Sequence, residues 1–337
     1  MNIKKVLITG ATGFLGNRVA IRLKGLGYEV TGVGRNKKKG EALKRKGIDF
    51  VLLDLENEEA VMNICKNHEY IFHCAALSSP WGKYKDFYKS NVESTKNLIK
   101  GSKKENIKRF IHVSTPSIYF DYQDKLNIRE DSILPRELVN DYAKTKLVAE
   151  KEIDQAFKEG LGVVTIRPRA LFGPGDTTIL PRLIRANHKG GIPLIDGGKG
   201  IIDVTYVENV VDALILCMNG EKNILGEKYN ITNGEPMVFI ELIQKLFHKL
   251  DIPLKTKNIS FERAYKIGGA MEWISKYILM GKEPILTRYS VGVLSKSQTL
   301  DIRKAKEELG YVSRVSIDEG LDVFVDWLRG EGAWLVR

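Results

Sequence analysis

Short, largely apolar runs alternate with longer amphipathic stretches over the first half of the chain. The runs carry few polar positions and are too short for helices, which is typical of strands buried on both faces of a parallel sheet. The stretches between them have apolar residues at helical spacing. This alternation predicts an α/β fold with a doubly wound parallel sheet from residue 3 to about residue 175. The predicted strands cover residues 4–9, 28–33, 50–53, 70–74 and 109–113.

A glycine-rich turn follows the first predicted strand. Residues 9–16 read TGATGFLG, with glycines at a spacing of three. Glycines let the backbone turn sharply and approach a pyrophosphate closely, while the N-terminus of the next helix faces the anion. The spacing differs from the common G-x-G-x-x-G fingerprint, and the alternative is a strand–helix turn without a ligand. The turn predicts a dinucleotide site of the Rossmann type, contacted by Gly10, Thr12, Gly13, Phe14, Leu15 and Gly16.

The second predicted strand is followed by the basic segment GRNKKK. Enzymes that select NAD tend to place an acidic residue here for the ribose hydroxyls, whereas an arginine accommodates a 2′-phosphate. Arg35 and Asn36 occupy these positions, so we expect a preference for NADP(H), with NAD(H) as the alternative cofactor. A solvated basic start of a helix is the other explanation. Two further strand ends are expected on the adenine and ribose side of the site, Asp54-Leu55 and Ala75-Ala76.

Candidate catalytic residues lie in the segment YAKTK. Tyr142 and Lys146 are four residues apart and share one face of a predicted helix. A free tyrosine has a pKa of about 10, and a nearby ammonium together with an oxidised nicotinamide lowers that pKa towards the working range. Ser114 and Thr115 follow the strand at 109–113, at the sheet edge where ligands bind. Together these residues predict redox catalysis on a carbonyl or an alcohol.

Several segments resemble the extended short-chain dehydrogenases/reductases, in the group of epimerases, dehydratases and 3β-hydroxysteroid dehydrogenases. They occur in the order typical of that family and span most of the chain. The resemblance implies a Rossmann domain followed by a substrate lobe. The segments are TGATGFLG at 9–16, Asp54-Leu55, HCAA at 73–76, NVxxT at 91–95, HVSTPSIY at 112–119, YAKTK at 142–146, IRPRALFGPGD at 166–176 and DVTYVENVVDA at 203–213.

The resemblance also implies roles for the matching residues. Thr115 would be the active-site hydroxyl, Tyr142 the acid–base residue, and Lys146 its activator and a ribose ligand. Pro168 would begin the segment beside the nicotinamide amide. Asn91 would organise the backbone or hold a water, although a buried helical asparagine is equally ordinary. The cofactor contacts expected from this half of the site are Asn91, Ser114, Tyr142, Lys146 and Pro168.

Other segments resemble the bacterial 2-alkyl-3-oxoalkanoate reductases of long-chain olefin synthesis. They are SSPWGKYKDFYKSNV at 78–92, STPSIYF at 114–120, LPRLI at 180–184 and LTRYSVGVLSKSQTLD at 286–301. Those enzymes use NADPH to reduce a β-keto acid that carries two alkyl chains, and sterol-processing dehydrogenases share several of the same segments. The residues expected at the substrate are Ser78, Trp81, Ser117, Arg169 and Met271.

The regular alternation of short apolar runs and amphipathic stretches ends at about residue 175. A basic helix is predicted at 180–189 and a strand–helix return at 202–218, followed by a helix near 238–250. A chain of 337 residues can form a nucleotide-binding domain and a smaller lobe. The expected division is an NADP-binding Rossmann domain at 1–175, rejoined by 201–218, and a smaller mixed C-terminal substrate lobe at 176–200 and 219–337.

The composition narrows the choice of partners. The net charge is +11, with lysines spread along the chain, and no basic motif is interleaved with aromatic residues, so no nucleic-acid partner is expected. An anionic substrate or an anionic membrane surface accounts better for the excess charge. Neither a signal peptide nor a membrane-spanning apolar run is recognisable. The cysteines lack metal-binding spacing and the histidines are scattered, which predicts a cytoplasmic protein without a metal site. The cysteines are Cys65, Cys74 and Cys217.

The stretch 264–284 bears on the substrate. Ile267, Met271, Ile274 and Ile278 recur at helical spacing with few charges between them. One interpretation is the buried face of a lobe helix. The other is a flexible lid over an apolar pocket that contacts the membrane where an alkyl-chain substrate resides. The glycines that would let it bend are Gly268, Gly269 and Gly281.

Three functions are compatible with these features. The leading one is an NADPH-dependent reductase of a lipid-like β-keto acid or related ketone, with a 3β-hydroxysteroid or sterol dehydrogenase as a related alternative. The second is a nucleotide-sugar epimerase, for which arginines could bind a diphosphate; dehydration is disfavoured because Pro116-Ser117 replace the Asp-Glu typical of dehydratases. The third is a non-catalytic NADP sensor, which would not need an acid–base pair. The arginines that could bind a diphosphate in the epimerase alternative are Arg182, Arg185 and Arg263.

The resemblance implies a homodimer through helices around 84–101 and 140–159.

Overall fold

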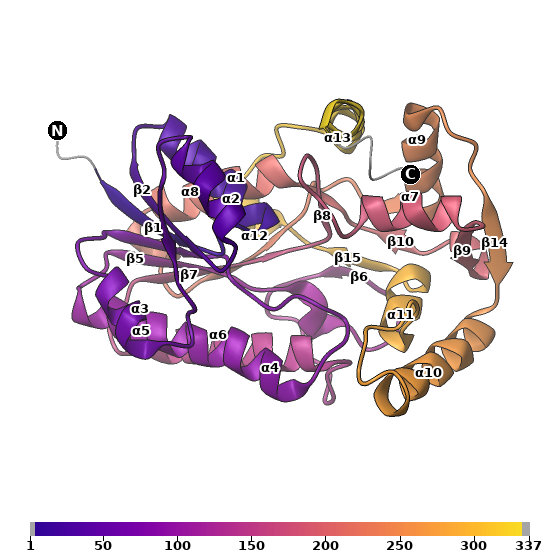
Figure 1. Cartoon of the computed structure of the whole chain (residues 1–337), viewed down its shortest axis with the longest axis horizontal. Coiled ribbons are helices and arrows are strands. Elements are labelled where there is room, and N and C mark those ends of the chain that lie inside the picture. The colour runs from indigo at the N-terminus through magenta and orange to yellow at the C-terminus, as the bar shows by residue number, and fades with distance from the viewer. Residues whose placement is uncertain (1–3, 332–337) are drawn as a thin grey trace.

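The computed structural model describes residues 4–331 and consists of a large sheet layered between helices, with a smaller lobe beside it (Figure 1). The large sheet has seven strands, all parallel, in the order β12-β7-β5-β4-β1-β2-β3. The expected doubly wound α/β fold is therefore confirmed. Its strands are β1 (Lys5–Thr9), β2 (Glu29–Gly34), β3 (Asp49–Leu52), β4 (Tyr70–His73), β5 (Arg109–Val113), β7 (Val163–Pro168) and β12 (Lys228–Ile231).

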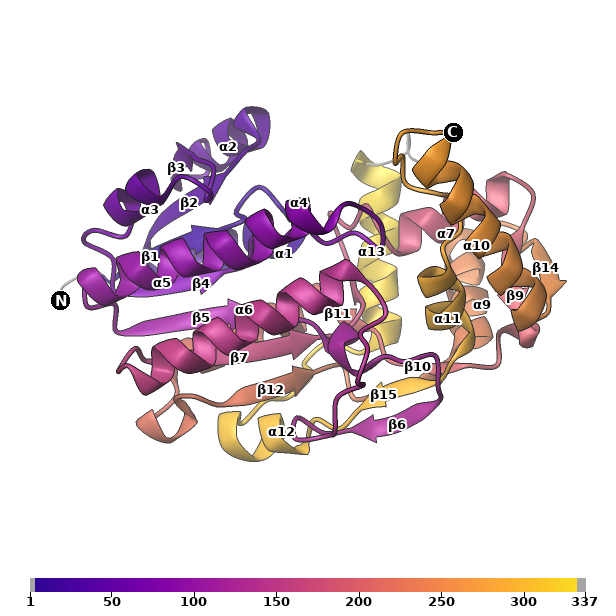
Figure 2. The ribbon, with the colours of Figure 1, turned by 90° about the horizontal axis from the view of Figure 1, so that it is seen from below.

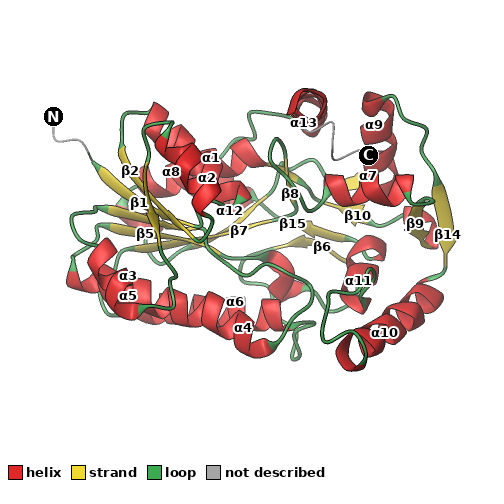
Figure 3. Cartoon of the chain, in the orientation of Figure 1, coloured by secondary structure: helices red, strands yellow, loops and turns green. Residues whose placement is uncertain are grey.

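Helices cover both faces of this sheet (Figures 1 and 3). Apolar residues on the strands alternate between the two faces, so each face has its own core beneath its helices. The helices on one face are α1 (Phe14–Gly25), α2 (Lys37–Lys44), α8 (Val207–Asn219) and α12 (Arg303–Leu309). Those on the other are α3 (Glu58–Ile64), α4 (Tyr84–Tyr88), α5 (Ser94–Lys104) and α6 (Asp141–Lys158), with a π-helical turn at Lys89–Glu93.

The smaller lobe has a separate apolar core and lies beyond the carboxyl ends of the parallel strands, as Figure 2 shows. Its helices are α7 (Leu180–His188), α9 (Phe239–Leu250), α10 (Phe261–Tyr277), α11 (Arg288–Ser295) and α13 (Ile317–Glu331). A four-stranded sheet contains β13 (Met237–Val238), β10 (Ile201–Ile202), β15 (Gln298–Leu300) and β6 (Lys125–Ile128). Two short pairs join β11 (Thr205–Tyr206) to β8 (Leu171–Phe172) and β14 (Thr256–Ile259) to β9 (Ile192–Ile195).

The observed sheets depart from the expected division of the chain. β12, expected in the substrate lobe, pairs in parallel with β7 and extends the large sheet. α12 packs beside it, and its Ala305 is buried in the same core as the glycine-turn helix. β6, expected in the Rossmann domain, pairs with β15 of the lobe instead. The alternation of apolar and polar segments could not predict these pairings, because each strand pairs with a partner that is distant in the chain. Residues 1–3 and 332–337 of the expected domains lie outside the described residues.

α10 is not the buried core helix that one interpretation of its sequence predicted. Trp273, Tyr277 and Ile278 are 58%, 64% and 61% exposed, respectively. The helix instead contacts α11 through its small residues. At Gly268 a Cβ would lie 3.0 Å from the backbone nitrogen of Arg288, so glycine permits the close approach of the two helices. No helix in the described part of the chain is long and apolar enough to cross a membrane.

Candidate active site

The glycine turn between β1 and α1 is built for close backbone contacts. Gly10 has a φ of +69°, and a Cβ there would lie 2.8 Å from the backbone nitrogen of Ala75 at the end of β4. A Cβ on Gly16 would lie 2.4 Å from the carbonyl oxygen of Gly10. Side chains are thus excluded where α1 begins, and the first turn of α1 carries no acidic residue. The exposed N–H groups and the helix dipole therefore suit an anion such as a pyrophosphate.

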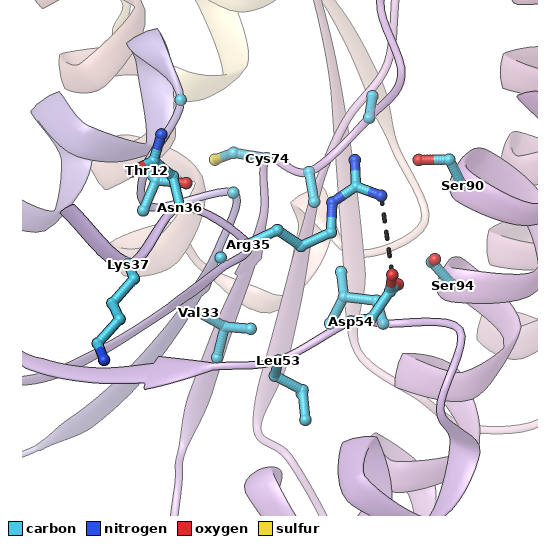
Figure 4. A pocket seen from close by; sticks show the side chains of 16 residues that line it. Thr12, Val33, Arg35, Asn36, Lys37, Leu53, Asp54, Cys74, Ser90 and Ser94 are labelled. Carbon is cyan, nitrogen blue, oxygen red and sulfur yellow. Dashed lines mark ion pairs between the residues drawn. The ribbon is translucent and has the colours of Figure 1, made fainter. Parts of the chain in front are cut away.

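A pocket of about 580 Å³ opens beside this turn, across the carboxyl ends of β1 to β4 (Figure 4). It gathers most of the predicted cofactor residues of the first 76 positions, while Phe14, Leu15 and Gly16 form or flank the first turn of α1. Ser90 and Ser94 also line it, and the sequence interpretation missed both, although Ser90 directly precedes the recognised NVxxT segment and Ser94 lies within it. The predicted residues that line the pocket are Gly10, Thr12, Gly13, Arg35, Asn36, Asp54, Leu55, Ala75 and Ala76.

Arg35 and Asp54 face each other across this pocket, as Figure 4 shows. Their charged atoms are 3.8 Å apart, and the side chains are 64% and 52% exposed. A long, exposed ion pair of this kind contributes little to stability, so the guanidinium can be redirected to a ligand at low cost. The Asn36 side chain accepts a hydrogen bond from the backbone of Lys39 at 3.0 Å and caps α2. The pocket therefore fits the adenosine end of a dinucleotide.

Tyr142 lies in the first turn of α6, which Asn140 caps by accepting a hydrogen bond from the Ala143 backbone at 2.8 Å. Burial raises the pKa of Tyr142 above its ordinary value, although hydrogen bonds with the hydroxyls of Thr115 and Ser78 act in the opposite direction. The phenol is therefore protonated at neutral pH. The structure brings these three predicted residues together.

Lys146 lies one helical turn further along α6 and is buried. Its Nζ donates to the Val113 carbonyl oxygen at 2.8 Å and lies 3.3 Å from Nε2 of His112. Burial lowers the pKa of Lys146 to about 8. The Nζ atom is engaged at the end of β5, and the expectation that this ammonium and an oxidised nicotinamide together lower the pKa of Tyr142 stays a prediction.

His73 lies beneath the site and forms its hydrogen bonds within the protein. Its ring nitrogens lie 2.8 Å from the hydroxyl of Thr9 and 2.9 Å from the hydroxyl of Thr95. Burial lowers the pKa of His73 to about 3, so the ring is neutral. His73 thereby ties β1 and β4 to α5 directly below the glycine turn.

Asn91 organises the loop that follows β4. Its Oδ1 accepts from the Leu77 backbone at 2.7 Å, and its Nδ2 donates to the Leu77 carbonyl at 3.3 Å and to Thr145 at 3.1 Å. The amide is thus engaged within the protein, so it serves the backbone-organising role rather than reaching the cofactor. This arrangement holds Ser78, the next residue in the loop, against Tyr142.

The hydroxyl of Ser114 is engaged within the protein, and its contact with a cofactor stays a prediction. Its hydroxyl donates to the carboxylate of Glu150, which also binds Arg167 through two hydrogen bonds of 2.9 and 2.6 Å. Arg167 donates in addition to Tyr119, and its guanidinium lies over the tyrosine ring. The sequence interpretation missed this network. The sequence did offer one sign of this network, because Arg167 places a charge in the mostly apolar strand β7.

The substrate side adds a second phenol to the site. Thr115 donates to the Ser117 hydroxyl at 3.0 Å, and Ser117 lies 3.0 Å from the hydroxyl of Tyr289 on α11. Tyr289 was not singled out from the sequence. Among the other expected substrate residues, Trp81 donates from Nε1 to the Gly281 carbonyl at 3.1 Å and so joins the β4 loop to the lobe.

The remaining predicted residues, Pro168, Met271 and Arg182, have no contact among the described residues that indicates a ligand. Pro168 ends β7 opposite Ile231, and Met271 is half-buried on α10; their ligand contacts stay predictions. Arg182, considered for a diphosphate, forms an exposed ion pair with Glu283 at 3.1 Å. Within residues 4–331, no group of three or more histidine, cysteine or acidic side chains could hold a metal ion.

Comparisons with known proteins agree with this site. The chain is 31% identical to a 2-alkyl-3-oxoalkanoate reductase from Stenotrophomonas maltophilia over 94% of its own length and 97% of the relative. It is 34% identical to an Arabidopsis thaliana 3beta-hydroxysteroid-dehydrogenase/decarboxylase, over 85% of this chain and 68% of the relative. The fold matches UDP-glucose 4-epimerase of Thermotoga maritima with a TM-score of 0.78 and 24% identity, over 97% and 99% of the two chains.

Residues 6–232 match the NAD dependent epimerase/dehydratase family, which accounts for more than half of the chain. The matched region contains the glycine turn, the hydroxyl pair after β5 and the Tyr142–Lys146 pair. The chain therefore belongs to the NAD dependent epimerase/dehydratase family and is an oxidoreductase that acts between alcohol and carbonyl groups.

Proposed function

We propose that this chain is an NADPH-dependent reductase that converts a lipid-like 3-oxo acid, or a related ketone, to the 3-hydroxy product. The observation that carries the proposal is the Tyr142 phenol, which forms hydrogen bonds with the hydroxyls of Thr115 and Ser78. A neutral phenol is the form that can donate a proton to a carbonyl oxygen. The relatives named 2-alkyl-3-oxoalkanoate reductase support the substrate class.

In this mechanism, the hydroxyl of Thr115 donates a hydrogen bond to the substrate carbonyl oxygen and fixes its position. The nicotinamide cofactor supplies the hydride that the carbonyl carbon accepts. Tyr142 donates its proton to the oxygen as negative charge develops there. The Ser78 hydroxyl then donates a hydrogen bond to the resulting phenolate, and the ammonium of Lys146, one turn away, offsets its charge.

The direct test follows the reverse reaction, reduction of NADP⁺, by absorbance with a long-chain 2-alkyl-3-hydroxy acid. A hydroxy acid avoids the spontaneous loss of CO₂ that β-keto acids undergo. A 3β-hydroxysteroid and a UDP-sugar serve as parallel substrates. Turnover with the alkyl acid alone is the expected result. Interconversion of the sugar with no net change of cofactor would instead assign the chain to the epimerases.

Arg35→Asp is expected to weaken NADPH binding by about 100-fold, because it removes a charge-assisted contact to the 2′-phosphate and places a second carboxylate beside Asp54. NADH lacks that phosphate, so its affinity should change by no more than about threefold. Fluorescence titration measures both dissociation constants. Lys38→Asp is the matched control, since Lys38 is exposed on α2 and does not line the pocket. Equal losses for both cofactors would contradict the preference for NADP.

The exposed apolar side chains at the end of α10 support a further part of the proposal, contact with a membrane surface where an alkyl-chain substrate resides. Met280 and Ile285 are 97% and 96% exposed beside Trp273 and Ile278. The double variant Trp273→Ser/Ile278→Ser is expected to reduce cosedimentation with phosphatidylglycerol-containing vesicles several-fold. Leu126→Ser, at an exposed position on β6, should leave binding unchanged. Absence of wild-type binding would refute the contact.

We also propose a homodimer through the outer surfaces of α5 and α6, which lie side by side on one face of the large sheet (Figure 2). This proposal follows the family resemblance. Light scattering of the purified protein tests it, and a mass equal to that of a single chain would refute it.

A further inference from the structure

Arg169 is a buried cation without a matching anion. Its side chain follows β7 directly and is 8% exposed. It donates from Nη1 to Oε1 of Gln298, but its Nε has no hydrogen-bond partner, and it takes part in none of the ion pairs among residues 4–331. Arg167, two residues earlier, is fully paired with Glu150. Buried charges are ordinarily paired, so an exception at a ligand-binding edge requires a physical reason.

Gln298 presents a second unused donor at the same place. Its Oε1 accepts from Arg169, which fixes the orientation of the amide, and its buried Nε2 then has no partner. Two adjacent donors, one after β7 and one on β15 of the smaller sheet, are thus left without an acceptor. Donors arranged in this way match the two oxygens of a carboxylate.

The nearest acidic group does not complete the pair. Asp203 interacts with Arg169 through its charge, but its carboxylate accepts a hydrogen bond from the Leu300 backbone at 2.7 Å and forms no ion pair within the described chain. Burial raises the pKa of Asp203 to about 6, so its negative charge is itself disfavoured there. Asp203 therefore leaves the unpartnered donors of Arg169 and Gln298 without an acceptor.

A short polar chain connects Arg169 to the reaction centre. The charge of Arg169 acts on Tyr289, whose hydroxyl lies 3.0 Å from Ser117. Ser117 accepts from Thr115 at 3.0 Å, and Thr115 contacts Tyr142. The carboxylate and the ketone oxygen of a 3-oxo acid are separated by a single carbon between their two carbonyl carbons. A substrate that places its ketone at Thr115 would therefore direct its carboxylate towards the neighbouring polar side chains of this site.

We propose that Arg169 and Gln298 form the binding site for the carboxylate of the substrate, so that this enzyme selects 3-oxo acids over neutral ketones and esters. The proposal rests on the reductase function proposed above. The planar guanidinium fixes the acid end in one orientation, and the ketone carbon is then held in register with Thr115 and Tyr142.

The test compares a long-chain 2-alkyl-3-hydroxy acid with its methyl ester, which differs mainly in the missing charge. Arg169→Gln is expected to raise KM for the acid by about 30-fold or more, the effect of removing one partner of a buried charge pair. KM for the ester should change by less than about threefold. Arg263→Gln is the matched control because Arg263 is an exposed arginine of the same lobe.

A binding measurement separates this proposal from a folding defect and from the proposed function. Calorimetric affinity for the hydroxy acid, with NADPH present, should fall by about 30-fold in Arg169→Gln and stay unchanged in Arg263→Gln. Unaltered NADPH affinity shows that the variant is folded. Equal losses for acid and ester, or an unchanged affinity for the acid, would overturn the carboxylate site alone. Wild-type turnover of a UDP-sugar only would refute the reductase function, and loss of UDP-sugar binding in Arg169→Gln would then assign the pocket to phosphate.

Discussion

Tyr142→Phe is expected to lower kcat for ketone reduction by about 10³-fold, because it removes the proton donor and leaves the rest of the site in place. The phenyl ring of the variant would still pack against Phe87, so the local fold should persist. Steady-state kinetics with a 3-oxo substrate and NADPH measures the loss. NADPH affinity, measured by fluorescence, should stay within about twofold of the wild type, since the hydroxyl acts on the substrate.

Tyr289→Phe is the informative comparison for this prediction. Tyr289 also places a phenol in the site, but its hydroxyl reaches Thr115 only through Ser117. Its removal should therefore cost less than about tenfold in kcat, the effect of one neutral hydrogen bond. If Tyr289→Phe abolished turnover and Tyr142→Phe retained it, the assignment of the proton donor would be reversed.

Glu150→Ala is expected to lower the free energy of unfolding by about 3 to 5 kcal/mol, because it leaves the buried guanidinium of Arg167 without its anion. The two side chains are 2% and 5% exposed, so water cannot replace the lost contacts. The variant also frees the Ser114 hydroxyl, which donates to the same carboxylate. Urea denaturation followed by circular dichroism measures the change.

Two controls separate the charge effect from the loss of packing. Glu58→Ala removes an exposed ion pair with Lys100 and should cost no more than about 1 kcal/mol. The double variant Glu150→Leu/Arg167→Met removes both charges and should be more stable than Glu150→Ala, since no unpaired ion remains. A double variant that is less stable than Glu150→Ala would contradict the argument from charge.

Sequence patterns of short range predicted the glycine turn of the cofactor end and the tyrosine that we propose as the proton donor. The TGATGFLG turn needs glycine because Gly10 and Gly16 leave no room for side chains, and that requirement is visible in consecutive residues. The spacing of Tyr142 and Lys146 likewise follows from the helix repeat. Apolar runs located the first strands of the sheet to within a few residues.

Other features arise only when distant segments pack together. Ser117 meets Tyr289 across 172 positions, and Arg169 meets Gln298 across 129. The same holds for β12, which extends the sheet only because it pairs with β7. Burial, which raises the pKa of Tyr142, is likewise a property of the assembled site.

The sequence by itself therefore determined the parallel α/β sheet, the dinucleotide turn and the tyrosine–lysine pair, since each depends on residues close in the chain. The tertiary structure alone decided which charges find partners. Glu150 forms an ion pair with Arg167, whereas the Nε of Arg169 has no hydrogen-bond partner. Pairing of buried charges depends on the distances between side chains brought together by packing, and a linear pattern carries no such distances.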